Sequence, residues 1–122
     1  MRTSIALLAA AAAVVPVAAA HSAAATTLVA SVGKHDAFTI ALTTASGKRV
    51  TSLPAGRYVI VVHDYSAIHN FALGSVTANK RIFTGSVPGV GTKTYRVTLT
   101  PGKYAYACSA HPTTMHGSFS VR

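Results

Sequence analysis

The segment CSAHPTTMHGSF, residues 108–119, gathers four side chains that can bind a soft or borderline metal ion: Cys108, His111, Met115 and His116. It holds the single cysteine of the chain, Cys108, together with His111 and Met115. The order Cys-x2-His-x3-Met places a thiolate, an imidazole and a thioether in one short loop between two expected strands. A second imidazole could come from His69, which lies in the segment SAIHNF at the start of another expected strand.

A set of two imidazoles, one thiolate and a weak axial thioether is the donor set of a type 1 copper site. Zinc is a poorer fit, because neither Cys-x2-Cys nor His-x3-His occurs to complete four strong ligands. A nucleophilic Cys108 with His111 as its base would need an orienting group and an oxyanion site. A buried structural cysteine is the remaining alternative, and the nearby His and Met at this spacing favour copper over it.

The segments YAYACSAHPTTMHGSFSV and VVHDYSAIHNFAL together resemble the cupredoxin family, the group of plastocyanin, pseudoazurin and amicyanin. The resemblance extends over residues 36–122. It implies an all-β fold, an antiparallel Greek-key β-sandwich, with one type 1 copper ion per chain. By the same resemblance His69, Cys108 and His111 would be the equatorial copper ligands, and Met115 would be the axial ligand.

The residues around these ligands have expected roles of their own. The resemblance implies that the side chain of Asn70 ties the two ligand-bearing loops together, which would hold the thiolate and tune the metal. Asp64 is expected to bond the backbone of the loop that leads to His69, as Asx residues often do. His63 and His116 are expected to be surface residues. Nothing connects the remaining histidines to the site: His21 and His35.

Two features depart from the nearest family patterns. The three residues between His111 and Met115 give a spacing between the shorter amicyanin-like loop and the longer plastocyanin-like loop. Loop length affects how the axial sulfur sits, so the pattern leaves the reduction potential open. The disulfide of azurin-like members is also missing, because Cys108 is the only cysteine.

Strand patterns follow one another along most of the chain, and no helical period is present. The expected strands are residues 38–43, 57–64, 69–73, 81–84, 93–100, 103–108 and 116–121. Short strands separated by Pro/Gly turns predict an antiparallel sandwich or barrel. The similar segments LPAGRYVIVVHD and LTPGKYAYACSA are expected to be neighbouring strands that deliver polar side chains to one rim.

Residues 1–20 have the features of a cleaved export signal, with one early basic residue, an apolar run over 5–17 and three final alanines. The apolar run is too short to span a bilayer comfortably. Cleavage as late as residue 25 also fits, and residues 26–122 are expected to form the cupredoxin-like domain. The protein is expected in the periplasm, in the cell envelope or in the medium. A lone thiol kept in such an oxidising compartment indicates a buried or coordinated cysteine.

The chain is strongly basic, with 11 Lys and Arg against 2 Asp and Glu and a formal net charge of +9. Removing Arg2 with the signal leaves ten basic and two acidic residues, or +8. The basic residues are scattered and not interleaved with aromatics, so nucleic-acid binding is not indicated. The charge favours an acidic partner or an anionic surface, and keeping a small exported protein dissolved explains it equally well.

These observations and the resemblance imply an exported, monomeric one-electron carrier and not an enzyme. Electrons would pass through the exposed edge of His111, within an apolar docking rim of Ala67, Ala110 and Pro112. The partner would be a transient redox protein, with an acidic one compatible with the charge. No stable membrane insertion is expected once the signal is removed. Two alternatives stay open: copper scavenging or delivery, and a metal-free interaction module with the same fold.

Overall fold

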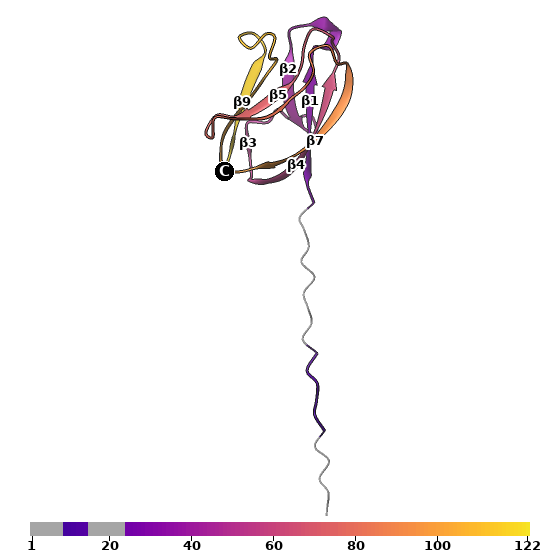
Figure 1. The fold of residues 1–122 in the computed structure, drawn as a ribbon, viewed down its shortest axis with the longest axis vertical. Helices are drawn as coiled ribbons and strands as arrows, with labels where there is room; N and C mark the ends of the chain where they lie inside the picture. Colours follow the sequence, from indigo (N-terminus) through magenta and orange to yellow (C-terminus); the bar gives the residue numbers. More distant parts are fainter. Residues whose placement is uncertain (1–8, 15–23) are drawn as a thin grey trace, which may run out of the picture.

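The computed structural model describes residues 9–14 and 24–122. Within these residues nine strands form two sheets packed face to face, and the only helical turn is η1 (Lys34–Asp36) (Figure 1). The expected signal peptide of residues 1–20 falls mostly outside the described residues. No helix in the described part of the chain is long and apolar enough to cross a membrane.

Each sheet is assembled from segments far apart in the sequence. The first sheet has the order β2 (Ile40–Thr44), β1 (Thr26–Val32), β4 (Gly56–Asp64), β7 (Gly91–Leu99). The second has the order β3 (Ser52–Leu53), β9 (His116–Val121), β8 (Gly102–Ala107), β5 (Ala72–Ser75), β6 (Lys80–Thr84). The expected all-β sandwich is therefore confirmed. Two of its strand pairs are parallel, β1 with β4 and β3 with β9, and the others are antiparallel.

The core lies between the two sheets because successive side chains on a strand point to opposite faces. In β4 the alternate residues Tyr58, Ile60 and Val62 are buried, and in β8 the alternate residues Tyr104 and Tyr106 are buried. β4 and β8 thus contribute side chains to the apolar layer from opposite sheets.

The observed strand bounds show where the period-two pattern was a good guide. The expected strand at residues 116–121 is confirmed, and the one at 57–64 begins one residue earlier. The strand expected at 69–73 begins only at Ala72, so His69 belongs to the preceding turn. β1 and β3 were not predicted. The expectation that the two similar segments are neighbours was wrong, because β4 and β8 lie in different sheets.

Both of those strands nevertheless run toward the same end of the sandwich. β4 ends at Asp64 and β8 ends at Ala107, and the loops 33–39, 65–71, 85–90 and 108–115 gather beyond them (Figure 1). We call this the ligand end, and the opposite end the far end. The ligand end is where the sequence places every candidate metal ligand.

Candidate metal centre

Three donor side chains converge at the ligand end. The nitrogen and sulfur donor atoms of His69, Cys108 and His111 all lie within 4.8 Å of one another. The Nδ1 atoms of the two histidines are 3.0 Å apart. Cys108 Sγ lies 3.8 Å from Nδ1 of His69 and 3.7 Å from Nδ1 of His111.

These separations fit a single metal ion. An ion with bonds of about 2.0 Å to nitrogen and about 2.3 Å to sulfur, in a trigonal array, would separate S from N by about 3.7 Å. The two S···N distances have this value, so the donors need little movement to share one ion. A thiolate with two imidazoles in trigonal positions is the core of a type 1 copper site.

The ligand loop closes on itself through backbone hydrogen bonds. The His111 N–H donates to the Cys108 carbonyl at 3.1 Å, and the Met115 N–H donates to the His111 carbonyl at 2.9 Å. The Cys108 N–H in turn donates to the Met115 carbonyl at 3.0 Å. This loop presents three potential donors from one tight turn.

Burial separates the donors into two kinds. His69, Cys108 and Met115 are each 0 % exposed, whereas His111 is only partly buried. Met115 and Cys108 both belong to the buried apolar core of the domain. Any ion held here would reach solvent, or another protein, past His111.

Asn70 joins the two ligand-bearing segments, as expected. Its side-chain amide donates to the Gly85 carbonyl and to Ser109 Oγ, both at 2.8 Å. Its Oδ1 accepts the Ser109 N–H at 2.7 Å. Its own backbone N–H points at Cys108 Sγ from 3.4 Å. Asn70 thus places a backbone donor beside the sulfur as well as joining the two loops.

The orientation of His69 is fixed from its far side. Its Nε2 lies 3.4 Å from the carbonyl oxygen of Asp36, which is an acceptor, so Nε2 carries the hydrogen. That leaves the lone pair on Nδ1, the nitrogen that faces His111 and Cys108. The sequence did not indicate this contact, because it involves a backbone atom from another loop.

Phe38 lies next to the two histidines of the cluster, and the sequence analysis placed it wrongly in a strand. It lies before β2, and its ring packs edge-to-face against His69 and His111, with centroids 4.9 and 4.7 Å away. The ring is 54 % exposed, so it covers the two imidazoles from the solvent side. The expected apolar rim of Ala67, Ala110 and Pro112, all exposed, is therefore extended by a large aromatic side chain.

The turn between β4 and His69 is held by side-chain caps. Asp64 Oδ1 accepts the Ser66 N–H at 3.0 Å, which confirms the expected Asx bond, and Ser66 Oγ accepts the Ile68 N–H at 3.3 Å. Burial raises the pKa of Asp64, and the hydrogen bond from the Ser66 N–H opposes this shift. The turn thus begins with a partly desolvated carboxylate.

The other histidines among the described residues, His35, His63 and His116, lie outside the cluster. His116 is exposed, as expected, and its Nδ1 lies 3.1 Å from the Pro112 carbonyl. His63 is partly exposed and bonds Thr92 Oγ1 at 3.0 Å. His35 is exposed in η1, and His21 falls outside the described residues.

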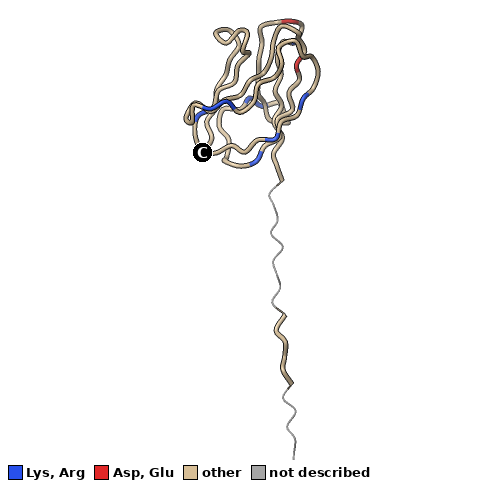
Figure 2. The backbone as a smooth tube through the Cα atoms, viewed as in Figure 1, with Lys and Arg blue, Asp and Glu red and all other residues tan. Residues whose placement is uncertain are grey.

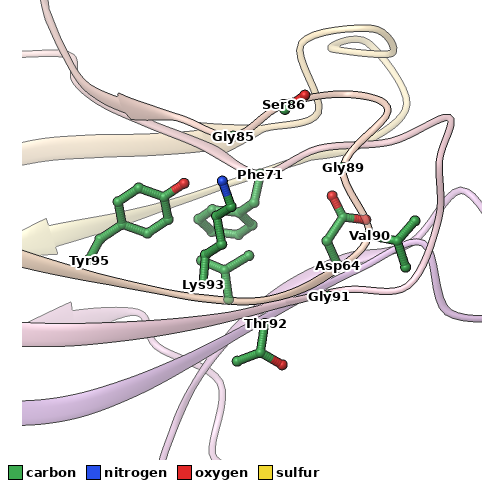
Figure 3. Close-up of a pocket in the computed structure, with 11 residues that line it drawn as sticks. Asp64, Phe71, Gly85, Ser86, Gly89, Val90, Gly91, Thr92, Lys93 and Tyr95 are labelled. Carbon is green, nitrogen blue, oxygen red and sulfur yellow. The ribbon is translucent and has the colours of Figure 1, made fainter.

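A separate small cavity of about 90 Å³ opens beside the site (Figure 3). The side chains of Asp64, Phe71, Lys93 and Tyr95 surround it, together with the glycine-rich loop 85–91. None of the candidate ligands lines it. The cavity is therefore not the metal centre.

No protein-family model and no curated protein sequence matches this chain. Solved structures do match it. A structure of the copper protein rusticyanin has a TM-score of 0.61 at 17 % identity, covering 79 % of this chain and 76 % of that one. Reduced rusticyanin has a TM-score of 0.59 at 16 % identity, covering 84 % and 82 %. A reduced amicyanin variant has a TM-score of 0.50 at 15 % identity, covering 79 % and 82 %.

At these identities the likeness establishes the fold and nothing finer. The donor cluster, described above from its own distances, lies where loops meet at one end of that fold. The chain therefore has the cupredoxin fold, with a type 1 copper-like cluster at its ligand end.

Proposed function

We propose that this protein is an exported type 1 copper protein that carries single electrons between redox partners. The observation that supports this most directly is the convergence of two imidazole nitrogens and one thiol sulfur within 4.8 Å. His69, Cys108 and His111 would hold the ion in its trigonal plane, and Met115 would supply the axial thioether. The likeness to the copper protein rusticyanin supports the same assignment.

Bound copper would supply a one-electron couple, and the chain's own residues would keep its surroundings constant. Asn70 holds the Cys108 segment through Ser109. The Asp36 carbonyl holds the ring of His69. Since these bonds do not involve the ion, the donors keep their places when its charge changes. Small rearrangement is the property that fast electron transfer needs.

The exposed ligand end suits brief contact with a redox protein. His111 is the least buried donor, and Phe38 and Ile68 add exposed apolar surface, at 54 % and 49 %. Weak redox complexes bury little area, so such a surface supports a transient partner. We propose a carrier and not an enzyme, exported by the signal at residues 1–20 and working as a monomer.

The first experiment adds Cu(II) to the purified apo-protein and records the visible absorption spectrum. We expect an intense thiolate-to-copper band that Cys108→Ala abolishes and His111→Ala shifts or abolishes. His63→Ala, which removes an imidazole from outside the cluster, is the matched control and should leave the band unchanged. A colourless wild-type mixture would exclude the type 1 site.

A second measurement separates electron transfer from copper scavenging or delivery. A carrier retains its ion in both oxidation states and exchanges electrons rapidly with itself. We therefore expect full copper retention after reduction and a fast self-exchange rate by NMR line broadening. Loss of the ion on reduction, or slow exchange, would favour the scavenger instead.

A further inference from the structure

Charge is segregated along the length of the strands. The only two acidic residues, Asp36 and Asp64, both lie at the ligand end, one in η1 and one at the last position of β4. Figure 2 shows both red segments near the top of the domain and most blue segments in its lower half. The strongly basic character of the chain therefore belongs mainly to the far end.

Strand register places the basic residues there. Arg57 is the second residue of β4, Lys103 is the second residue of β8, and Lys80 begins β6 opposite Ser75. All of these positions are at the ends of strands that point away from the ligand cluster. The exposed basic residues of the far half form a set that we call the basic pole: Lys48, Arg49, Arg57, Lys80, Arg81, Arg96, Lys103 and Arg122.

The far ends of both sheets meet in one surface. The Arg122 N–H donates to the Leu53 carbonyl at 3.0 Å, and the Arg122 carbonyl accepts the Ala55 N–H at 3.0 Å. These bonds join the end of β9 to the segment that starts β4. The basic residues of the two sheets consequently lie on the same end of the molecule.

Distance decides what this pole can bind. β4 has nine residues, and at about 3.3 Å per residue the two ends lie roughly 25 Å apart. Electron tunnelling falls off exponentially with distance, so a redox protein bound at the basic pole would be poorly placed to exchange electrons with the cluster. The pole therefore suits an anionic partner that takes no part in electron transfer.

We propose that the basic pole adsorbs this protein on an anionic membrane surface and leaves the ligand end facing away from the lipid. Clustered Lys and Arg side chains are attracted to anionic headgroups. The path of the chain also favours a membrane, because β1 begins at this pole, pairing Thr26 with Tyr58, and the apolar run over 5–17 precedes it. Until the expected signal is cleaved, the basic end is therefore the end of the domain nearest the membrane.

The test uses protein isolated from the exported fraction, so that every variant has its natural N-terminus. Binding is measured by co-sedimentation with vesicles of equal parts phosphatidylglycerol and phosphatidylcholine, and with phosphatidylcholine alone. The pole variant is Lys80→Gln with Lys103→Gln. The matched control is Lys34→Gln with Lys93→Gln, which removes the same charge from the ligand half. Urea midpoints confirm that both variants are folded.

We expect binding to the anionic vesicles only, weakened by salt. At about fivefold per charge, the pole variant should bind roughly twentyfold more weakly, and the control much less so. Equal losses in both variants would mean that net charge alone matters and would overturn the proposal. Absent binding, or equal binding to neutral vesicles, would also overturn it. Stronger binding to soluble poly-glutamate than to vesicles would replace the membrane with an acidic protein. None of these outcomes depends on copper, so the proposed function is tested separately.

Discussion

Asn70 connects two segments that are 39 positions apart along the chain. Its amide is 0 % exposed and makes bonds to Gly85 and Ser109 while its backbone faces Cys108 Sγ. Buried polar groups left without partners cost about 1–3 kcal/mol each. Asn70 therefore joins two loops and also places a hydrogen-bond donor beside Cys108 Sγ.

Asn70→Ala should lower the free energy of unfolding of the apo-protein by about 2–4 kcal/mol, because the Gly85 carbonyl and the Ser109 N–H lose their partner. Urea denaturation measures this. Ser109→Ala removes only one of the bonds at an exposed position and should cost much less. Equal effects from the two substitutions would show that the ties to Gly85 and to the Ser109 backbone contribute little.

Phe38 shields the two imidazoles, so its removal should let water reach the site. Edge-to-face aromatic pairs contribute about 0.5–1.5 kcal/mol each, and Phe38 makes two. Phe38→Ala should therefore accelerate copper loss to a chelator by about tenfold and lower the reduction potential, since water stabilises the more highly charged ion. In the apo-protein it should also remove ring-current shifts from the His69 and His111 proton resonances.

Two variants control for this effect. Phe38→Tyr keeps the ring at a position with room for a hydroxyl and should behave like the wild type. Val76→Ala truncates a side chain of similar exposure, 53 %, next to β5 at the far end and should change none of these quantities. Unchanged chelator kinetics and resonances in Phe38→Ala would show that the ring only lies near the histidines.

At the scale of elements, the loop from β1 to β2 passes directly beside His69. Gly33 has φ +71°, and a Cβ there would lie 2.6 Å from the Ser66 Cβ and 2.9 Å from the His69 Cδ2. No other residue type fits both the backbone conformation and the contact. The same loop supplies Phe38 and the Asp36 carbonyl, so its path determines how His69 is held.

Gly33→Ala should destabilise the protein by about 2–4 kcal/mol, combining left-handed strain with a steric clash, and should broaden or shift the copper band. Gly47→Ala is the matched control, because Gly47 also has a positive φ, +90°, but nothing lies within 4 Å of its would-be Cβ. It should show only the smaller backbone cost, of about 1–2 kcal/mol, and an unaltered spectrum. If both variants lose the same free energy of unfolding, backbone strain alone explains the effect and the steric clash contributes nothing.

The turn after β4 contains a carboxylate whose pKa is raised by burial, Asp64. A raised pKa means that the folded state disfavours the charged form, so this penalty is present at neutral pH and disappears as the pH falls below the usual value of 3.8. Asp64→Asn retains an oxygen for the Ser66 N–H and should raise the urea midpoint at pH 7 but not at pH 3. A lower midpoint at pH 7 would show that the negative charge itself supports the turn.

The sequence predicted those strands and site residues that can be recognised from local patterns alone. β4 was predicted from its run of β-branched residues, and β9 from the alternation of Phe119 and Val121. Cys108 was identified because no other cysteine exists. Phe38 was misplaced because it continues the alternation of Ile40 and Leu42, although the strand begins only at Ile40. Contacts between loops, such as that of Phe38 with His111, depend on how the sheets bring distant segments together and leave no local pattern.

At the scale of the whole molecule, most of the apolar layer between the sheets consists of strand residues that are not candidate metal ligands. Residues such as Ile60, Leu42 and Tyr106 are at most 1 % exposed at positions set by strand pairing. We therefore expect the apo-protein to keep its β-sheet circular dichroism and to unfold cooperatively. Copper should then raise the melting temperature, because it binds only the folded state. An apo-protein without sheet structure would show instead that the metal is needed for folding.

The pairing of β3 with β9 has a consequence for how the molecule is made. Ser52 pairs with Ser120, so the second sheet cannot be completed until the final strand arrives. The segment from Cys108 to Met115 lies just before that strand, so it follows the other four strands of its sheet in chain order. The loop that carries the thiol is therefore closed by the same strand that completes the sheet, because Ala107 of β8 pairs with His116 of β9.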